Sequence, residues 1–202
     1  MTVRAPVDAS YDPHVSMNPA PRIPPLPLAD WPPEMKAATA PLMPATPRPP
    51  GQPRGLNILG TFAHHTDLAA AFWVFNGHIL NSSRLTPRQT ELAVLRVALL
   101  RNSTYEWKQH LYAARACGIT EAEIAAIEGS AGTHEWSAAD GALLAAVDEL
   151  VESGTLSDGT WTALSASMDA QQVLDLIYTV GAYLVIAMML SVAGTPLDDD
   201  LV

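Results

Sequence analysis

The hydrophobic pattern of this 202-residue chain is helical from Thr66 towards the C-terminus. Apolar residues recur at three- and four-residue spacing, and no segment shows a convincing alternation of apolar and polar residues that would indicate a β-strand. Helices are predicted to begin near Thr66 and then to cover residues 87–101, 103–117, 120–129, 137–154, 157–167 and 169–194. The pattern therefore predicts an all-α fold.

Short polar signals support these helix ends. Thr86, Pro87 and Gln89 provide an N-cap, a proline at the first helical position and the partner of a capping box. Thr120 and Glu123 repeat the capping box in a later helix. The first helix is expected to be capped by its own Thr66 and to have an apolar face made of Leu68, Phe72, Phe75 and Ile79.

Residues 1–54 differ in composition from the rest of the chain. Fifteen of the 17 prolines lie at or before Pro53. Proline fixes φ and lacks a backbone N–H, so this segment is predicted to be an extended arm, with a disordered tail over residues 1–18. The part between about 22 and 45 is expected to dock on the helical domain, residues 55–202, or on a neighbouring subunit. Its apolar residues are Ile23, Leu26, Leu28, Trp31, Met35, Leu42 and Met43.

Charge and cysteine content exclude several classes of protein. The formal net charge is -10, which argues against nucleic acid or an anionic membrane as the main partner, because both require a basic surface. A single cysteine, Cys117, excludes an intrachain disulfide framework and any multi-cysteine zinc or iron–sulfur site. The N-terminus has no apolar run behind a basic start, so a cytoplasmic protein is expected.

The segment from Leu176 to Ala193 is nearly all apolar and is about as long as a membrane span. It also contains Thr179, Gly181 and Ser191, and no basic flank follows it. A helix buried in a core or a subunit interface is the favoured interpretation, with no membrane partner. This much apolar surface predicts a homo-oligomer.

Candidate chemistry lies at polar positions on apolar faces, because burying a polar group is costly unless it is paired. Glu91 shares a helical face with Val94, Leu95 and Ala98. Ser103, Glu106 and His110 follow at i, i+3 and i+7, so they lie on one stripe of the next helix. A carboxylate and an imidazole one turn apart form a general acid–base pair, or else only a surface i,i+4 pair. Spacing alone leaves both possibilities open.

The arrangement Glu91-x11-Ser103-x2-Glu106-x3-His110 resembles the signature of the carboxymuconolactone decarboxylase and alkyl hydroperoxidase D-like superfamily. The segments RIPPLP, ELAVLRVALL, YEWKQH, ARACGIT and AGTPLD also resemble this superfamily, in the same order. The resemblance covers about residues 22–200. It implies an alkyl hydroperoxidase D-like helical bundle and a homo-oligomer such as a dimer, trimer or hexamer.

One departure from the superfamily pattern decides which activity is expected. Ser103 and Glu106 occupy the positions of the two cysteines in the peroxidase branch. Peroxide reduction by that route requires a thiolate and a resolving thiol, and Cys117 is expected to be an inert core residue. The resemblance therefore implies the thiol-free branch. Its named activity removes carbon dioxide from a carboxylated unsaturated lactone without a metal or an organic cofactor.

The predicted catalytic residues are Glu106 and His110, with Glu91 holding His110. Either Glu106 or His110 is expected to protonate the carbon that loses carbon dioxide. The predicted substrate contacts are Ser103, Tyr105, Trp107, His65 and Phe75, with helix capping as the alternative for Ser103 and core packing for the aromatic residues. Arg96 is expected to pair with a carboxylate as part of the structure. No metal site is expected, because His64 and His65 point about 100° apart on a helix.

These inferences lead to one favoured function and two alternatives. The favoured function is a cofactor-independent lyase or isomerase acting on a small carboxylated or lactone-like metabolite. The alternatives are a non-catalytic ligand-binding helical oligomer and a thiol peroxidase that uses Cys117. Decarboxylation, isomerisation, hydrolysis and a retro-aldol step all remain open, because all can use the same acid–base pair.

Overall fold

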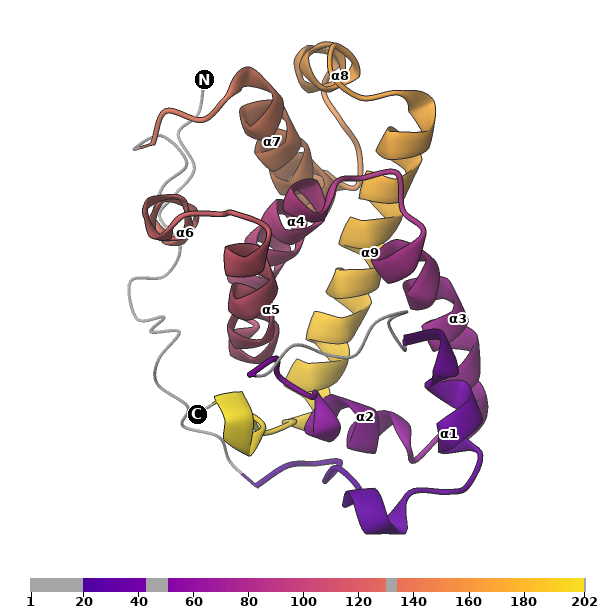
Figure 1. The fold of residues 1–202 in the computed structure, drawn as a ribbon. Helices are drawn as coiled ribbons and strands as arrows, with labels where there is room; N and C mark the ends of the chain where they lie inside the picture. Colours follow the sequence, from indigo (N-terminus) through magenta and orange to yellow (C-terminus); the bar gives the residue numbers. More distant parts are fainter. Residues whose placement is uncertain (1–19, 43–50, 130–133, 202) are drawn as a thin grey trace.

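The structure is a computed structural model that describes residues 20–42, 51–129 and 134–201. The tail predicted over residues 1–18 lies outside this part of the chain. The described residues form α-helices joined by short connections (Figure 1). Their bounds are α1 Met35–Ala38, α2 Leu56–Phe62, α3 Thr66–Asn81, α4 Pro87–Leu100, α5 Thr104–Ala116, α6 Glu121–Glu128, α7 Ala138–Ser153, α8 Asp158–Ser165 and α9 Ala170–Ala193. The predicted all-α fold class is confirmed.

Most of the predicted helix ends are confirmed, because local side-chain chemistry sets them. Thr86 and Gln89 form the capping box of α4, and Thr120 and Glu123 form that of α6. Asp169 caps α9. α7 and α9 end at glycines in the left-handed region, Gly154 and Gly194.

The start of α3 differs from the prediction. The N-cap residue is His65 and not Thr66, because the His65 ring accepts the Leu68 backbone N–H at 3.3 Å. The predicted apolar face is confirmed in part, because Ile79 is buried and Phe72 and Phe75 pack against the core. Leu68 is 52% exposed, whereas the buried stripe contains Ala69, Trp73 and Asn76. The two stripes are adjacent on the helix, and the packing of α3 determines how deeply each of these residues is buried.

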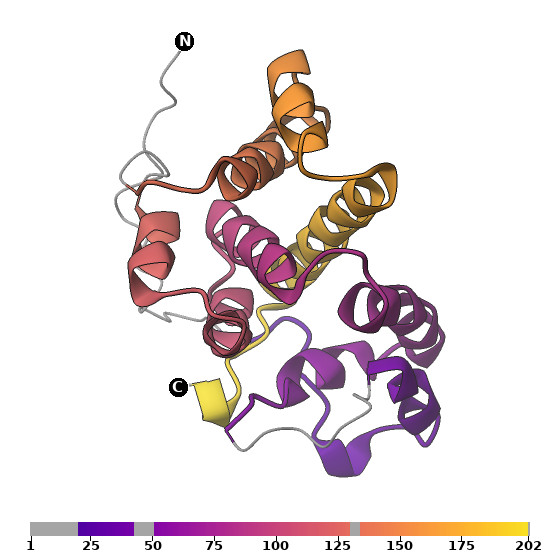
Figure 2. The same ribbon diagram turned by 45° about the horizontal axis from the view of Figure 1, so that its top comes forward.

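α4 is the central helix of the fold and lies between α5, α7 and α9 (Figures 1 and 2). Leu92, Val94, Leu95 and Val97 are fully buried in the main core. Arg96 is bonded to Asp148 of α7, with Nε to Oδ1 at 2.6 Å and Nη2 to Oδ2 at 2.9 Å. The expected structural pairing of Arg96 with a carboxylate is therefore confirmed.

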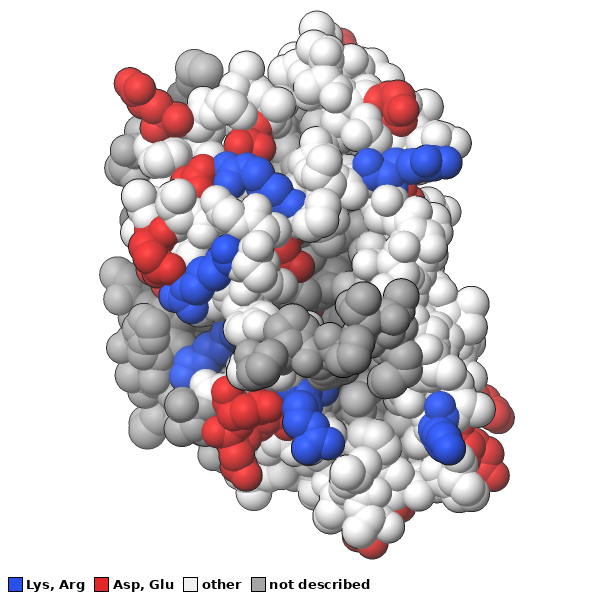
Figure 3. Space-filling model, in the orientation of Figure 1, with Lys and Arg blue, Asp and Glu red and all other residues white. Residues whose placement is uncertain are grey.

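α9 is long and apolar enough to cross a membrane by length and composition, and half of its apolar window is buried inside the protein. Its inner face packs against α3, α4, α7 and α8. Its outer face is apolar and exposed at Leu174, Tyr178, Val185, Met188 and Val192. In the view of Figure 3, charged side chains gather over α5 to α7, and the surface over α3 and α9 is mostly uncharged. The homo-oligomer stays a prediction.

Residues 20–42 lie along α2, α3 and the end of α9 (Figure 1). The Leu26 N–H donates to the Gly60 carbonyl at 3.1 Å, and a Cβ at Gly60 would lie 2.5 Å from the Leu26 oxygen. A Cβ at Gly77 of α3 would lie 2.9 Å from the Pro41 oxygen. Two glycines therefore let the proline-rich segment approach the helices closely, and this brings Leu42 to the cavity described next.

α2 is absent from the helices predicted from the sequence. It has seven residues, and its N-cap residue Gly55 provides no capping side chain. Asp198 near the C-terminus holds α2 in place by accepting the Asn57 N–H at 2.7 Å and the Tyr105 hydroxyl at 2.5 Å. A helix this short depends on such long-range contacts, which periodicity does not reveal.

Candidate active site

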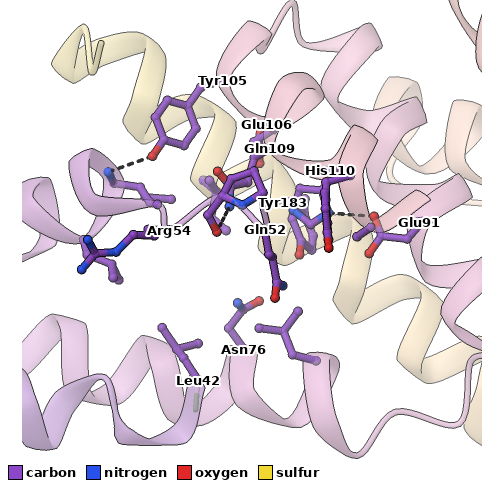
Figure 4. A pocket seen from close by; sticks show the side chains of 18 of the residues that line it. Leu42, Gln52, Arg54, Asn76, Glu91, Tyr105, Glu106, Gln109, His110 and Tyr183 are labelled. Carbon is purple, nitrogen blue, oxygen red and sulfur yellow. Dashed lines mark hydrogen bonds and ion pairs between the residues drawn. The ribbon is translucent and has the colours of Figure 1, made fainter. Parts of the chain in front are cut away.

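A cavity of about 360 Å³ lies between α3 and α5 and is closed by α2, α9 and residues 52–55 (Figure 4). This volume is near the lower end for small-molecule sites. The residues that line it include Leu42 of the arm, Gln52 and Arg54, Ile58 of α2, Trp73 and Asn76 of α3, Glu91 of α4, Glu106, Gln109 and His110 of α5, and Tyr183 of α9.

Glu91 and His110 are joined across the α4–α5 interface. His110 Nδ1 lies 2.8 Å from Glu91 Oε2, and the side chains are only 14% and 11% exposed. Burial lowers the pKa of His110, but the charges of Glu91 and Glu106 and the bond to Glu91 outweigh it, so that the pKa is raised overall. Glu91 therefore orients the ring and favours its protonated form. This contact has the geometry predicted for Glu91 holding His110.

Glu106 is the most unusual group in the cavity. It is 3% exposed, and among the described residues neither carboxyl oxygen has a hydrogen-bond partner. Burial raises the pKa of Glu106 to about 7, against smaller opposing effects of the Ser103 hydroxyl and the charge of His110. A carboxyl group with this pKa gives up or accepts a proton near neutral pH, as a general acid–base group must.

Tyr183 of α9 completes this side of the cavity. Its ring packs edge-on against that of His110, with centroids 5.0 Å apart. Burial and the nearby Glu91 and Glu106 keep the Tyr183 pKa well above its usual value, so the phenol stays protonated. The structure places Tyr183 in the pocket.

Ser103 and Tyr105 lie near the start of α5 and differ in their contacts. Ser103 stands at the N-cap position of α5 but makes no side-chain cap bond, and its buried Oγ has no partner in the described part of the chain. The capping alternative for Ser103 is therefore wrong. Tyr105 lines the cavity, but its hydroxyl donates to Asp198 and accepts the Ile58 N–H at 3.2 Å. Tyr105 thus ties α5 to α2 and the C-terminal segment.

Four predicted substrate contacts, namely Ser103, Trp107, Phe75 and His65, do not line this cavity. Trp107 is one residue beyond Glu106 and so points about 100° away around α5, into the main core. The Phe75 ring contacts Phe72 and Tyr178, with centroids 6.2 and 5.8 Å away. His65 is exposed at the start of α3, where it serves as the N-cap.

Sequence analysis did not select Arg54, Asn76 or Gln109, which all line the cavity. Gln109 Nε2 donates to the Pro53 carbonyl at 3.3 Å, and its buried Oε1 has no partner among described residues. Asn76 was detectable in principle, because it follows Ala69 and Trp73 at helical spacing. Arg54 has no periodic signal, since it lies in a connection before α2.

Cys117 does not line the cavity. Its Sγ donates to the Ala114 carbonyl at 3.2 Å, and burial raises the pKa of the thiol. These features oppose formation of a thiolate. Within residues 20–42, 51–129 and 134–201, no three His, Cys, Asp or Glu side chains are grouped to hold a metal ion.

Comparison with known proteins connects this site to a family. Residues 66–149 match the sequence model of the carboxymuconolactone decarboxylase family. The match supports the resemblance of the chain to the carboxymuconolactone decarboxylase and alkyl hydroperoxidase D-like superfamily. The family match runs from α3 through most of α7 and so includes Asn76, Glu91, Glu106 and His110. Among curated proteins, none matches the sequence significantly.

Solved structures with alkyl hydroperoxidase D-like folds resemble the chain along most of its length. An alkylhydroperoxidase AhpD core protein from Ralstonia eutropha JMP134, a peroxidase-related protein, has a TM-score of 0.73 at 16% identity, covering 91% of this chain and 95% of that one. A cysteine-to-alanine variant of the debrominase Bmp8, in complex with 2,3,4-tribromopyrrole, has a TM-score of 0.73 at 14% identity, covering 93% and 96%. At these identities the likeness establishes the fold alone.

Proposed function

We propose that this protein is a cofactor-independent acid–base enzyme, a decarboxylase-like lyase or an isomerase, that acts on a small carboxylated or lactone-like metabolite. The observation that carries the proposal is Glu106, a buried carboxyl group beside His110 in a cavity, which has no hydrogen-bond partner in the described part of the chain. A buried carboxyl group that has no partner among the described residues is available to a ligand.

In a decarboxylation, the proposed groups handle the bonds, the electron pair and the proton in the following order. The C–C bond to the substrate carboxylate breaks, carbon dioxide leaves, and the electron pair passes into a conjugated carbonyl system. Protonated Glu106 then donates its proton to the carbon. His110, held by Glu91 at 2.8 Å, or solvent returns a proton to Glu106. An isomerisation uses the same groups, with removal and return of a carbon-bound proton replacing the loss of carbon dioxide.

The substrate carboxylate requires a cation, and Arg54 is proposed for that role in place of His65. Arg54 is the one arginine or lysine among the described residues that line the cavity. It is exposed, which suits an anion that enters from solvent. The debrominase Bmp8 has a similar fold and forms a complex with 2,3,4-tribromopyrrole, which supports a small ring compound as the ligand here.

The alternative functions make different demands on the same residues. A non-catalytic binding protein would retain a ligand in the cavity without forming a product. A thiol peroxidase would need a reactive thiolate, and the raised pKa of Cys117 and its place outside the cavity weigh against that alternative.

The test measures turnover of carboxymuconolactone and related carboxylated lactones by the wild type, Glu106→Gln and Glu128→Gln. Glu128 is exposed on α6 and serves as the matched control. Carbon dioxide release and deuterium incorporation from D2O, followed by NMR, distinguish a lyase from an isomerase. We expect Glu106→Gln to lose about 10²- to 10⁴-fold in kcat, with Glu128→Gln unaffected.

The pH profile sharpens this test. Because Glu106 donates a proton with a pKa of about 7, wild-type kcat is expected to fall as pH rises through that value. Full turnover by Glu106→Gln would overturn the proposed role. Binding of these lactones without any product would instead favour the non-catalytic alternative.

A further inference from the structure

The wall of the cavity opposite the acid–base pair carries its own unpaired polar group. Asn76 of α3 is 3% exposed, and its Oδ1 has no hydrogen-bond partner in the described part of the chain. In Figure 4 its side chain points from α3 into the space faced by Glu106, Gln109 and His110 of α5. The cavity is thus polar at both ends.

Other asparagines of the chain show that Asn76 is exceptional. Asn81, five residues further along α3, donates its amide to the Pro41 carbonyl at 3.0 Å. The Asn57 amide donates to the Pro196 and Leu197 carbonyls at 3.3 and 3.1 Å. Buried amide groups are normally satisfied in this way, so an unpaired one that faces a cavity indicates a ligand group.

The surroundings of Asn76 hold it in place rather than pair with it. Gly77 next to it packs directly against Pro41. The Trp73 ring, one turn before, contacts Phe62 and Phe72 with centroids 4.7 and 5.0 Å away. A polar group on such a packed helix is pre-organised for binding.

The chemistry of the unpaired atoms defines the group that would bind. Asn76 Oδ1 is an acceptor and requires an O–H or N–H donor. Trp73 lines the same wall, and its indole N–H lacks an acceptor among described residues. A hydroxyl or enol group provides both a donor and an acceptor.

We propose that Asn76 anchors the substrate by accepting a hydrogen bond from a hydroxyl or enol group that lies across the cavity from the carbon handled by Glu106 and His110. The substrate is therefore a carboxylated compound with a second, hydroxyl-bearing end. This rests on the proposed function for the identity of the reacting end. The binding of the hydroxyl group by itself requires no catalysis.

The test compares stable probes that differ by one hydroxyl group. Benzoate, 3-hydroxybenzoate and 4-hydroxybenzoate are titrated by calorimetry against the wild type, Asn76→Leu and Thr179→Val. Thr179 on α9 is the matched control, because its fully buried Oγ1 also lacks a partner among described residues but does not line the cavity. We expect the wild type and Thr179→Val to bind at least one hydroxybenzoate about tenfold more tightly than benzoate. Asn76→Leu should lose this preference.

Asn76→Leu should also raise the melting temperature of the ligand-free protein, because it removes a buried amide oxygen that has no partner among the described residues. Asn76→Ala serves as a second variant that adds no bulk to the cavity. Equal binding of all three probes by the wild type, binding of none of them, or a preference that survives in both Asn76 variants would overturn the proposal. Glu106→Gln should keep the preference. Failure of the proposed anchoring role is therefore detected by the binding measurements, and failure of the proposed function is detected by the turnover measurements.

Discussion

Two of the partly buried ionic contacts of α4, Arg96–Asp148 and Glu91–His110, differ in how completely their polar atoms are paired. Arg96 makes two bonds to the Asp148 carboxylate and a third to the Ile127 carbonyl at 3.3 Å. Glu91 makes a single bond to His110, and beside this pair stands Glu106 with no partner in the described structure. The first contact joins packed helices, and the second faces a cavity.

The difference separates structural from functional ionic groups on one helix. A pair that is bonded on all sides holds helices together and offers nothing to a ligand. An unpaired buried carboxyl group reduces stability, and a fold retains it where a ligand supplies the missing bond. Three variants test this comparison, and they are given in order of decreasing expected effect.

Glu106→Gln should stabilise the protein in a pH-dependent way. Because burial raises the pKa of Glu106 from 4.5 to about 7, the folded state resists ionisation of the group. At a pH below the pKa that Glu106 has in the unfolded state, the group does not destabilise the fold. The destabilisation grows as the pH rises. It reaches about 3 kcal/mol once the pH exceeds the pKa of Glu106 in the folded state. Urea unfolding at about pH 4 and about pH 8 should show a gain over wild type only at the higher pH. An equal difference at both pH values would contradict the burial of an ionisable Glu106.

Arg96→Leu should destabilise the protein by about 2 kcal/mol, because it leaves the partly buried Asp148 without its partner. Turnover per folded molecule should not change. Arg115→Leu provides the control, since the Arg115–Glu121 pair is exposed and should contribute much less. Denaturant unfolding measures both variants. Loss of turnover in folded Arg96→Leu would contradict a purely structural role.

Cys117→Ser should have the smallest effect. The thiol makes one bond to the Ala114 carbonyl and does not reach the cavity, so the change in stability should be below about 1 kcal/mol. Turnover should be unchanged. Melting temperature and lactone turnover measure the two quantities. A large loss of activity would revive the thiol peroxidase alternative.

Local signals predicted most of the secondary structure correctly. The capping box of Thr86 and Gln89 acts within one turn, so its effect does not depend on distant parts of the chain. α3 shows the limit of local signals. His65 and Thr66 are adjacent potential caps, and the stripes that contain Leu68 and Ala69 are both helical in period. The packing of α3 against α1, α2 and α9 determines which of these residues are buried, and the sequence pattern alone does not.

The candidate site likewise contains residues that local patterns predicted and residues that they did not. The spacing of Glu106 and His110 predicted that they share a face of α5, because helical periodicity is a property of the backbone itself. The same periodicity turns Trp107 away from that face. It carried no information about Arg54 and did not single out Asn76, which enter the cavity from other segments.

Composition, helix ends and the acid–base stripe of α5 were thus determined by the chain locally, since each depends on residues within a few turns. Only tertiary packing decided three further features. These are the contact of Glu91 with His110, the lack of a hydrogen-bond partner for Glu106 among the described residues, and the position of Asn76 opposite them. Each of these depends on segments far apart in the sequence that meet when α3, α4 and α5 pack around one cavity. The environment of a buried polar group is built by its spatial neighbours, and this environment determines its pKa and its availability to a ligand.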